Sequence, residues 1–149
     1  MYKHILIATD GSEFARKGVD HGLSLAKTLG AKVSVVTVVE TWPAYGMGID
    51  GAWAASPTVF EEFRKTALET AEKSLADVTA AAKKIGVDID TVLVENQSPA
   101  TGIVDTADEK DCSLIVMASH GRRGVSRLLL GSQATEVLSS SKVPVLIIK

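Results

Sequence analysis

The sequence predicts an α/β domain in which helices cover both faces of a doubly wound, parallel sheet. Short apolar runs alternate along the chain with longer stretches of helical periodicity. The runs are rich in Val and Ile and apolar on both faces, as expected for strands buried on both sides of a parallel sheet. A chain of 149 residues has the ordinary size of one domain, residues 1–149, with its own core. Because crossovers between parallel strands are right-handed, few topologies remain, and the open doubly wound sheet leads them.

Five apolar runs are expected to form the strands. They are Ile5–Ala8, Val33–Val39, Thr91–Val94, Leu114–Ala118 and Val143–Ile148. In doubly wound sheets, ligands bind beyond the carboxyl ends of the strands, where the winding reverses. Functional residues are therefore expected directly after the strands, at 9–11, 38–40, 95–97 and after Ala118.

Helical patterns separate the strands, from Phe14 to Leu29, Phe60 to Ile85, Pro99 through Ala107, and about Gly131 to Leu138. Ser12 is the expected N-cap of the first helix and Gly30 its stop. Glycine inside a helix costs stability, so Gly18 and Gly22, one turn apart, indicate a close approach to the sheet. The long second helix should bury one apolar face, ended by Gly86. That face comprises Phe60, Phe63, Ala67, Ala71, Leu75, Val78, Ala82 and Ile85.

Composition and charge exclude several classes of protein. Hydrophobic residues make up 46 % and charged residues 23 % of the chain, and the formal net charge is −2. This balance provides no global field for binding nucleic acid or an anionic membrane. Neither a signal peptide nor a run long enough to span a bilayer is expected. The single cysteine, Cys112, precedes an apolar run and is expected to be a buried thiol. We expect a cytoplasmic protein.

The stretch 41–59 is longer than ordinary connections and contains both tryptophans. It is interpreted as a lid over the site, a partner-binding patch or a disordered loop, and the sequence does not choose among them. Residues 46–51 spell a literal G-x-G-x-x-G. A dinucleotide fingerprint leaves a strand directly and enters a helix, whereas Trp42-Pro43 precedes this one and further loop follows, so we reject that interpretation.

The richest segment runs from Ala118 to Ser132. Glycines at 121, 124 and 131 allow close backbone approach to a ligand, and the helix start near Ser132 offers unpaired N–H groups and a positive dipole end. Arg122, Arg123 and Arg127 add local positive charge. These features favour an anion cradle suited to phosphates. The alternative is that the glycines only shape the loop and Gly131-Ser132 only caps the helix.

This segment resembles the nucleotide motif of the universal stress protein family, G-x2-G-x9-G-[ST]. Ala118-Ser-His-Gly121 is followed by nine residues and then by Gly131-Ser132. Residues 2–12, the run Leu128–Ser132 and the ending Val143–Ile148 are similar to the family as well, so the resemblance covers the whole chain. One departure is Ala118 in place of the first glycine. Its methyl costs little if the backbone has ordinary β angles, and more if φ is positive.

The resemblance implies a five-stranded sheet of order 3-2-1-4-5 and a homodimer formed through the last strand, Val143–Ile148. It also implies that ATP is the ligand, with Mg²⁺ held mainly through the phosphates. Ala118 and the carboxylate of Glu95 leave AMP, a cyclic nucleotide or an empty site as alternatives. Adenine and ribose would lie beside Asp10 and the adenine edge beside the Val38 backbone, with the phosphates on the glycine loop. The implied binding residues are Ala8, Thr9, Asp10, Val38, Met117, Ala118, His120, Gly121, Gly131, Ser132 and Gln133.

Two classes of function remain after these comparisons of motif and residue. The first is an ATP-binding regulatory or protective module of the stress response, with slow hydrolysis at most because no P-loop lysine is present. His120, inside the glycine loop, serves either backbone positioning or acid–base chemistry. The second is a dimeric interaction module with an empty nucleotide site. A nucleotidyl-transfer enzyme is a weaker third option because no further catalytic motif is seen. Glu95, at a strand end, also places a carboxylate near the expected pocket.

Overall fold

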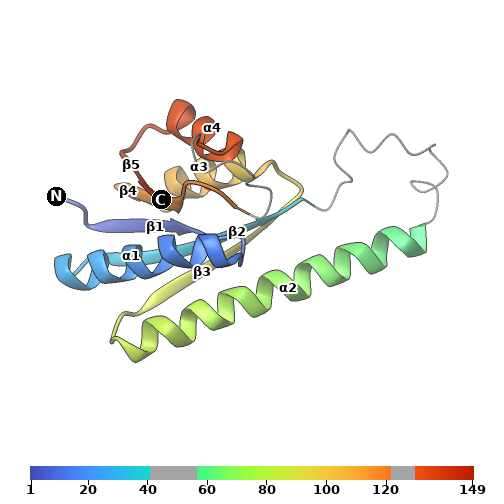
Figure 1. Ribbon diagram of the computed structural model, residues 1–149, viewed down its shortest axis with the longest axis horizontal. Coiled ribbons are helices and arrows are strands. Elements are labelled where there is room, and N and C mark those ends of the chain that lie inside the picture. Colours follow the sequence, from blue (N-terminus) through green and yellow to red (C-terminus); the bar gives the residue numbers. More distant parts are fainter. Residues whose placement is uncertain (41–56, 122–129) are drawn as a thin grey trace.

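A computed structural model describes residues 1–40, 57–121 and 130–149, and a five-stranded parallel sheet organises them (Figure 1). The strands are β1 (His4–Ala8), β2 (Lys32–Val39), β3 (Ile89–Glu95), β4 (Leu114–Ala118) and β5 (Val145–Ile148). The helices are α1 (Glu13–Leu29), α2 (Pro57–Lys84), α3 (Pro99–Glu109) and α4 (Ser132–Ser140). The strand order is β3-β2-β1-β4-β5, which confirms the predicted topology.

Two helices cover each face of the sheet (Figure 1). Alternate residues of a strand point to opposite faces, so each strand contributes side chains to two cores. Ile5 and Ile7 pack in one core with residues of α1 and α2. Leu6 and Ala8 pack in the other core with residues of α3 and α4. The interiors of β1 and β4 are therefore buried on both sides, as their apolar composition predicts.

The ends of the first and third helices follow the local sequence. The Ser12 hydroxyl accepts a hydrogen bond from the Ala15 N–H, and Gly30 ends α1 in the left-handed conformation with φ +62°. Ser98 caps α3 by accepting from the Thr101 N–H, and Pro99 occupies the first helical position, where a missing N–H costs nothing. These caps confirm the helix starts and stops predicted from sequence.

Close packing of α1 on β4 explains the glycines of that helix. A Cβ added at Gly18 would lie 2.9 Å from the backbone nitrogen of Ala118, and one added at Gly22 would lie 2.6 Å from Cδ1 of Ile7. Only glycine allows α1 to lie this close to the sheet. The approach predicted from the two glycines is confirmed.

The predicted apolar face of α2 is wrong at both ends. Its buried residues are Ala71, Leu75, Val78 and Ala82, whereas Phe63 and Ile85 are exposed. The 28 residues of α2 span about 42 Å at ~1.5 Å per residue, and the eight residues of β2 span about 26 Å at ~3.3 Å per residue. The helix is longer than the sheet is deep, so its first half passes beyond the core (Figure 1), and Ile85 follows the last helical residue, Lys84.

Smaller boundary differences have local causes. α2 begins at Pro57, so 57–59 belong to the helix and not to the predicted loop 41–59, and the rest of that loop lies outside the described residues. β5 begins at Val145 rather than Val143, after Pro144, which has no N–H to donate. Among the described residues, no helix combines the length and apolar character needed to cross a membrane.

Candidate functional site

A cavity of about 530 Å³ opens at the carboxyl edge of the sheet, where β1 and β4 are neighbours and the winding reverses. Its size is that of a small-molecule site, since such pockets measure ~300–1,000 Å³. The ends of β1, β2 and β4, the start of α4 and the first half of α2 surround it. This is the position at which doubly wound sheets bind ligands.

Ten of the eleven site residues predicted from sequence line this one cavity. They are Ala8, Thr9, Asp10, Val38, Met117, Ala118, His120, Gly121, Ser132 and Gln133. The remaining residue, Gly131, does not line the cavity but directly precedes Ser132, which does. Its N–H donates to the Ser119 carbonyl at 2.9 Å. Gly124 and Arg122, Arg123 and Arg127 of the predicted anion cradle lie outside the described residues, as does 46–51.

The turn after β1 is held by its own side chains. The Asp10 carboxylate accepts from the Ser12 N–H at 2.9 Å, and the Thr9 hydroxyl accepts from the Gly11 N–H at 3.2 Å. Thr37 of β2 donates its hydroxyl to the Thr9 carbonyl at 2.9 Å. Gly11 has φ +75°, a conformation that glycine adopts without strain. The turn is therefore fixed to both β1 and β2, and it presents Thr9 and Asp10 to the cavity.

Two motif glycines are required by close approaches that the sequence does not reveal. A Cβ at Gly121 would collide with the Asp10 carboxylate, so the loop after β4 meets the turn after β1 at the wall of the cavity. A Cβ at Gly131 would lie 2.9 Å from the Ser119 carbonyl oxygen, which is where the Gly131 N–H forms its hydrogen bond. Both glycines thus bring the β4 loop and the start of α4 together around the cavity.

The start of α4 supplies the cavity with N–H groups. The first residues of any helix have no intrahelical partner for their N–H groups, and Gly131 is the N-cap without a side chain to cover them. The Gln133 side chain reaches away to α3, where its Oε1 accepts from the Ala100 N–H at 2.8 Å. The Gln133 side chain therefore pairs with an N–H group at the start of α3, whereas no side chain caps the start of α4. The positive end of the α4 dipole favours an anion there.

His120 and Ser119 form the polar pair of the loop after β4. Ser119 Oγ lies 3.0 Å from His120 Nδ1, and both residues line the cavity. A hydroxyl paired with an imidazole nitrogen is a common arrangement for proton transfer, and it also fixes the orientation of the ring. The pair is suited to either of the two roles expected for His120, backbone positioning or acid–base chemistry.

Ala118 occupies its position without backbone strain. It ends β4 paired with Ile148 of β5, and it is not among the described residues with positive φ, where the non-glycine cases are Asn96 and Asp111. The methyl group that replaces the first glycine of the motif therefore has ordinary backbone geometry. The costly alternative considered from sequence does not apply.

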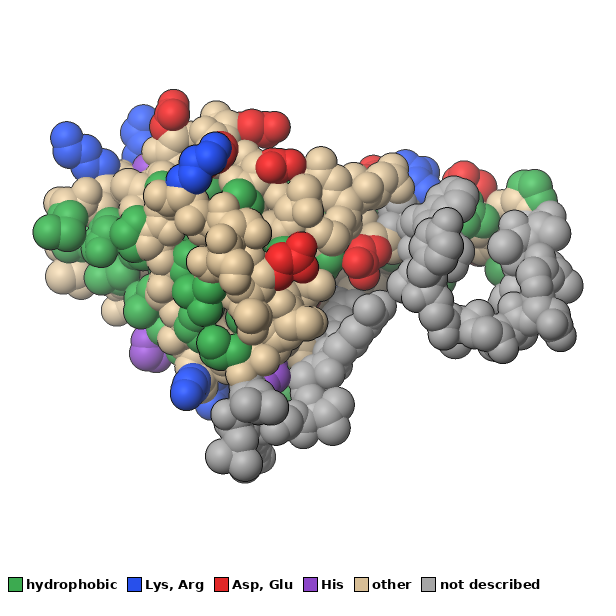
Figure 2. Space-filling model, turned by 90° about the horizontal axis from the view of Figure 1, so that it is seen from above, with side chains coloured by type: hydrophobic (Ala, Val, Ile, Leu, Met, Phe, Trp, Pro, Cys, Tyr) green, Lys and Arg blue, Asp and Glu red, His purple; other side chains and the backbone are tan. Residues whose placement is uncertain are grey.

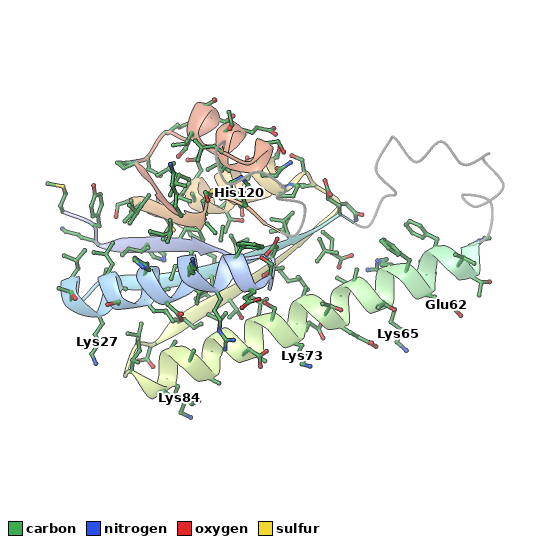
Figure 3. The ribbon with its side chains drawn as sticks, in the orientation of Figure 1. Lys27, Glu62, Lys65, Lys73, Lys84 and His120 are labelled. Carbon is green, nitrogen blue, oxygen red and sulfur yellow. The ribbon has the colours of Figure 1, made fainter. Side chains whose placement is uncertain are left out.

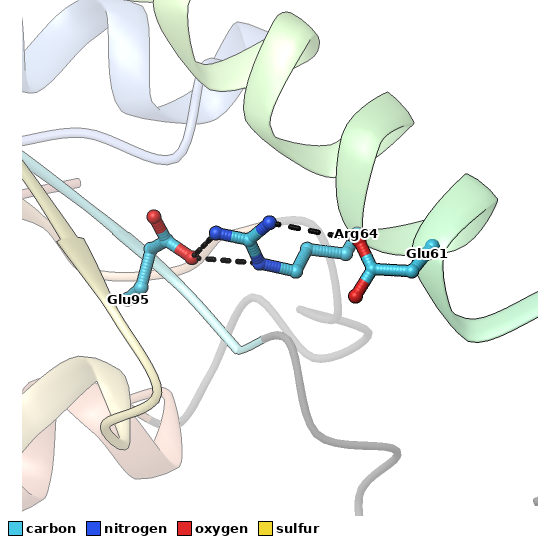
Figure 4. Close-up of polar contacts among 3 residues, drawn as sticks. All are labelled: Glu61, Arg64 and Glu95. Carbon is cyan, nitrogen blue, oxygen red and sulfur yellow. Dashed lines mark hydrogen bonds and ion pairs between the residues drawn. The ribbon is translucent and has the colours of Figure 1, made fainter. Parts of the chain in front are cut away.

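Glu95 contradicts its expected position. Arg64 of α2 donates to Glu95 Oε2 from both Nε and Nη2, at 3.1 and 2.9 Å, and also lies 3.7 Å from Glu61 (Figure 4). Glu95 does not line the cavity, whereas Glu40 at the end of β2 does. The Glu95 carboxylate, which we expected near the ligand, is thus paired with Arg64 of α2, a residue distant in the sequence.

Sequence reasoning also missed the wall that α2 contributes. Phe63, Thr66, Ala67 and Thr70 line the cavity. The periodicity placed Phe63 and Ala67 on the apolar face of α2, but they were assigned to the core. The length of α2 relative to the strands was the signal that could have placed Phe63 and Ala67 beyond the core.

Comparison with known proteins settles the family. A model of the universal stress protein family matches residues 1–149. The chain belongs to the universal stress protein family. A curated relative, universal stress protein MJ0531 of Methanocaldococcus jannaschii, is 35% identical over 100% of this chain and 83% of its own length.

Two solved structures of the family contain nucleotides. A universal stress protein in complex with cAMP superimposes with a TM-score of 0.72 and 27% identity, over 99% of this chain and 97% of that chain. The universal stress protein from Archaeoglobus fulgidus in complex with dAMP superimposes with a TM-score of 0.70 and 25% identity, over 99% and 98%.

Proposed function

We propose that this protein binds ATP in the cavity at the carboxyl edge of the sheet and acts as a cytoplasmic regulatory or protective module of the stress response. The observation that carries the proposal is the convergence of ten motif-derived residues on one cavity next to an open helix N-terminus. The cAMP and dAMP complexes of related proteins support a nucleotide as the ligand.

The phosphates are assigned to the start of α4. Ser132 and Gln133 line the cavity and carry N–H groups of the first helical turn. The Gly131 N–H is already bonded to Ser119, so we assign Gly131 the role of shaping the loop. Among the described residues, no group of three or more His, Cys, Asp or Glu side chains could hold a metal. Mg²⁺ would accordingly be held mainly by the phosphates.

Adenine and ribose are assigned to the other end of the cavity. β1 ends at Ala8, opposite Val36 of β2, so Val38 lies two residues beyond the end of its neighbouring strand. Its backbone is in position to meet the edge of a base. Thr9 and Asp10 lie on the turn that continues β1, next to Met117 and Ala118 at the end of β4. These four residues would surround the ribose.

Calorimetry with ATP and Mg²⁺ tests the proposal, and we expect a dissociation constant in the micromolar range. Gly131→Val should weaken binding because its side chain would displace the Ser119 carbonyl and move the start of α4. ATP at a hundred times its dissociation constant should also stabilise the fold by about 2.7 kcal/mol in thermal unfolding. If millimolar ATP produced no heat in calorimetry and no shift in thermal unfolding, the proposal of ATP binding would be refuted.

Hydrolysis is expected to be slow because the cavity, within the described part of the chain, contains no lysine to stabilise a transferring phosphoryl group. Turnover measured alongside binding separates a switch from an ATPase. Brisk hydrolysis that disappears in His120→Ala would contradict this part of the proposal and would assign His120 an acid–base role.

A second candidate function is a dimeric interaction module with no functional nucleotide site. β5 is an edge strand with half-exposed Val145, Ile147 and Ile148, and Leu138 and Leu146 are exposed on α4 and β5. Seen from the side of α3 and α4, hydrophobic side chains gather in a band on the surface (Figure 2). An unpaired apolar edge is suited to pairing with a second copy. Dimerisation through β5 is compatible with either function, and only the binding measurement separates them.

A further inference from the structure

The first half of α2 borders the cavity with a single helical face. The residues concerned follow the spacing i, i+3, i+4, i+7 that places side chains on one side of a helix. They are Phe63, Thr66, Ala67 and Thr70. Glu62 and Lys65 point to the opposite side of α2, away from the sheet (Figure 3). The cavity thus has a helical wall that faces the strand ends.

This wall is apolar despite its two threonines. The Thr66 hydroxyl donates to the Glu62 carbonyl at 2.9 Å, and the Thr70 hydroxyl donates to the Thr66 carbonyl at 2.8 Å. Both hydroxyl protons are used inside the helix, so the face has no hydroxyl donor for a ligand. Phe63 and Ala67 complete a surface suited to a flat apolar group and unsuited to phosphate.

Phe63 is the large side chain of this wall, and the fold does not bury it. Its side chain is 56% exposed, and the buried residues of α2 begin only at Ala71, two turns further on. An aromatic ring left in water forgoes the stabilisation that burial would give. A planar ligand in the cavity would cover the ring and recover that stabilisation.

The position of Phe63 is fixed by its neighbour in sequence. Arg64 binds Glu95 at the end of β3 through two N–H groups, and Glu95 pairs with Val39 of β2 (Figure 4). The same contact therefore ties the projecting half of α2 to the strand whose end lines the cavity. The buried residues of α2 begin only at Ala71, so this contact adds a tie to the half of the helix that precedes them.

The geometry points to Phe63 as the residue that stacks on the nucleobase of the bound nucleotide, with the Arg64–Glu95 ion pair as the contact that positions it. This inference rests on the proposed nucleotide site and adds a base-binding residue from an element outside the nucleotide motif. Every base has an aromatic face, so Phe63 contributes affinity for the base and little discrimination among bases.

Phe63→Ala tests the inference against two probes, ATP and inorganic triphosphate, with adenosine as a third ligand that lacks phosphate. Loss of one aromatic–base stack should weaken ATP and adenosine by about fivefold or more and leave inorganic triphosphate unchanged. Phe14→Ala is the matched control, because Phe14 is equally exposed at 55% and does not line the cavity. Thermal unfolding without ligand should be nearly the same for all three chains.

The outcomes separate this inference from the proposed function. Wild-type protein that binds neither ATP nor adenosine overturns both. Wild-type binding that Phe63→Ala leaves within about twofold overturns the stacking role alone. Equal loss of ATP and inorganic triphosphate in Phe63→Ala also overturns it, because such a loss indicates a distorted cavity rather than a missing stack.

Glu95→Gln tests the positioning role, because it removes the charge that holds Arg64 while keeping the size of the side chain. We expect weaker binding of ATP and adenosine and unchanged binding of inorganic triphosphate, the same split as for Phe63→Ala but smaller. In the double variant with Phe63→Ala, Glu95→Gln should add little further loss, since the Arg64–Glu95 pair acts on the base only through Phe63. Full additivity would contradict a positioning role.

Discussion

At the scale of single residues, burial and charge pairing decide which side chains are reactive. Cys112 lies in the core on the α3 and α4 side, and burial raises the pKa of its thiol from 9.0 to about 11. Asp90 is its opposite, an exposed carboxylate that accepts a hydrogen bond from Lys110 at 2.7 Å. Both lie away from the cavity, so they report on the fold rather than on the site.

Cys112 should be inert in the folded protein. Thiol reagents attack the thiolate, and a pKa of about 11 leaves almost none of it at pH 8. We expect negligible labelling by an aromatic disulfide reagent in native buffer and complete labelling in denaturant. Rapid native labelling would show that the core around Cys112 opens readily.

Asp90 should make stability fall at acidic pH. The hydrogen bond from Lys110 lowers the pKa of Asp90 below its ordinary value of 3.8, although burial opposes this shift. The carboxylate therefore contributes stability that is fully present above pH 3.8 and is lost as the pH falls through the lowered pKa. The effect is small because both partners are exposed, and high salt should reduce it.

Acid unfolding of wild type and Asp90→Asn, followed by circular dichroism, measures this contribution. The two proteins should converge in stability at low pH and differ at neutral pH. Asp20→Asn, which removes an exposed carboxylate of α1 with no ion pair among the described residues, should parallel wild type. A constant difference between wild type and Asp90→Asn at every pH would contradict the assignment.

At the scale of elements, the contact of α1 with β4 couples the core to the cavity. Gly18 packs against the backbone of Met117 and Ala118, two residues that line the cavity. Gly22, one turn later, packs against the side chain of Ile7. The two glycines differ in what a methyl group would meet, and that difference can be measured.

Gly18→Ala should destabilise the fold, because its Cβ would meet backbone atoms of a paired strand that cannot yield. Overpacking costs about 1–3 kcal/mol, against a gain of about 1 kcal/mol in helix propensity. Gly22→Ala is the matched control with the same gain, and its Cβ would meet the far end of Ile7, so we expect a smaller loss. Equal stability of the two variants in urea unfolding would contradict this explanation.

At the scale of the whole molecule, the sheet leaves one apolar edge uncovered at β5. Leu146 is 38% exposed in the middle of that strand. We predict that Leu146→Lys shifts a dimer towards monomer, because lysine on an edge strand opposes pairing with a second copy. Light scattering after size-exclusion chromatography measures the change. Leu29→Lys changes an exposed leucine at the end of α1, away from β5, and should leave the assembly unchanged.

ATP binding by the Leu146→Lys variant tests whether the nucleotide site is independent of dimerisation. Residues of β1, β2 and β4 and of all four helices line the cavity, and no residue of β5 is among them. A monomer should therefore retain its affinity. Loss of binding together with the dimer would show that the second copy completes the site.

The sequence by itself determined the elements and their order, and its motif resemblance identified ten of the residues that line the cavity. Strand burial follows from runs of Val and Ile, helix ends follow from Ser12, Gly30 and Ser98, and the glycine spacing marks the phosphate end. These features are local or periodic, so they can be read along the chain.

The tertiary structure alone decided what meets across the cavity. The partners of Gly121 and Gln133, Asp10 and Ala100, come from other elements, and Arg64 removes Glu95 from the place expected for it. The length of α2 relative to the sheet turned Phe63 from an expected core residue into a wall of the cavity. Such contacts depend on how long and how close the packed elements are, and a pattern within one element contains no information on either.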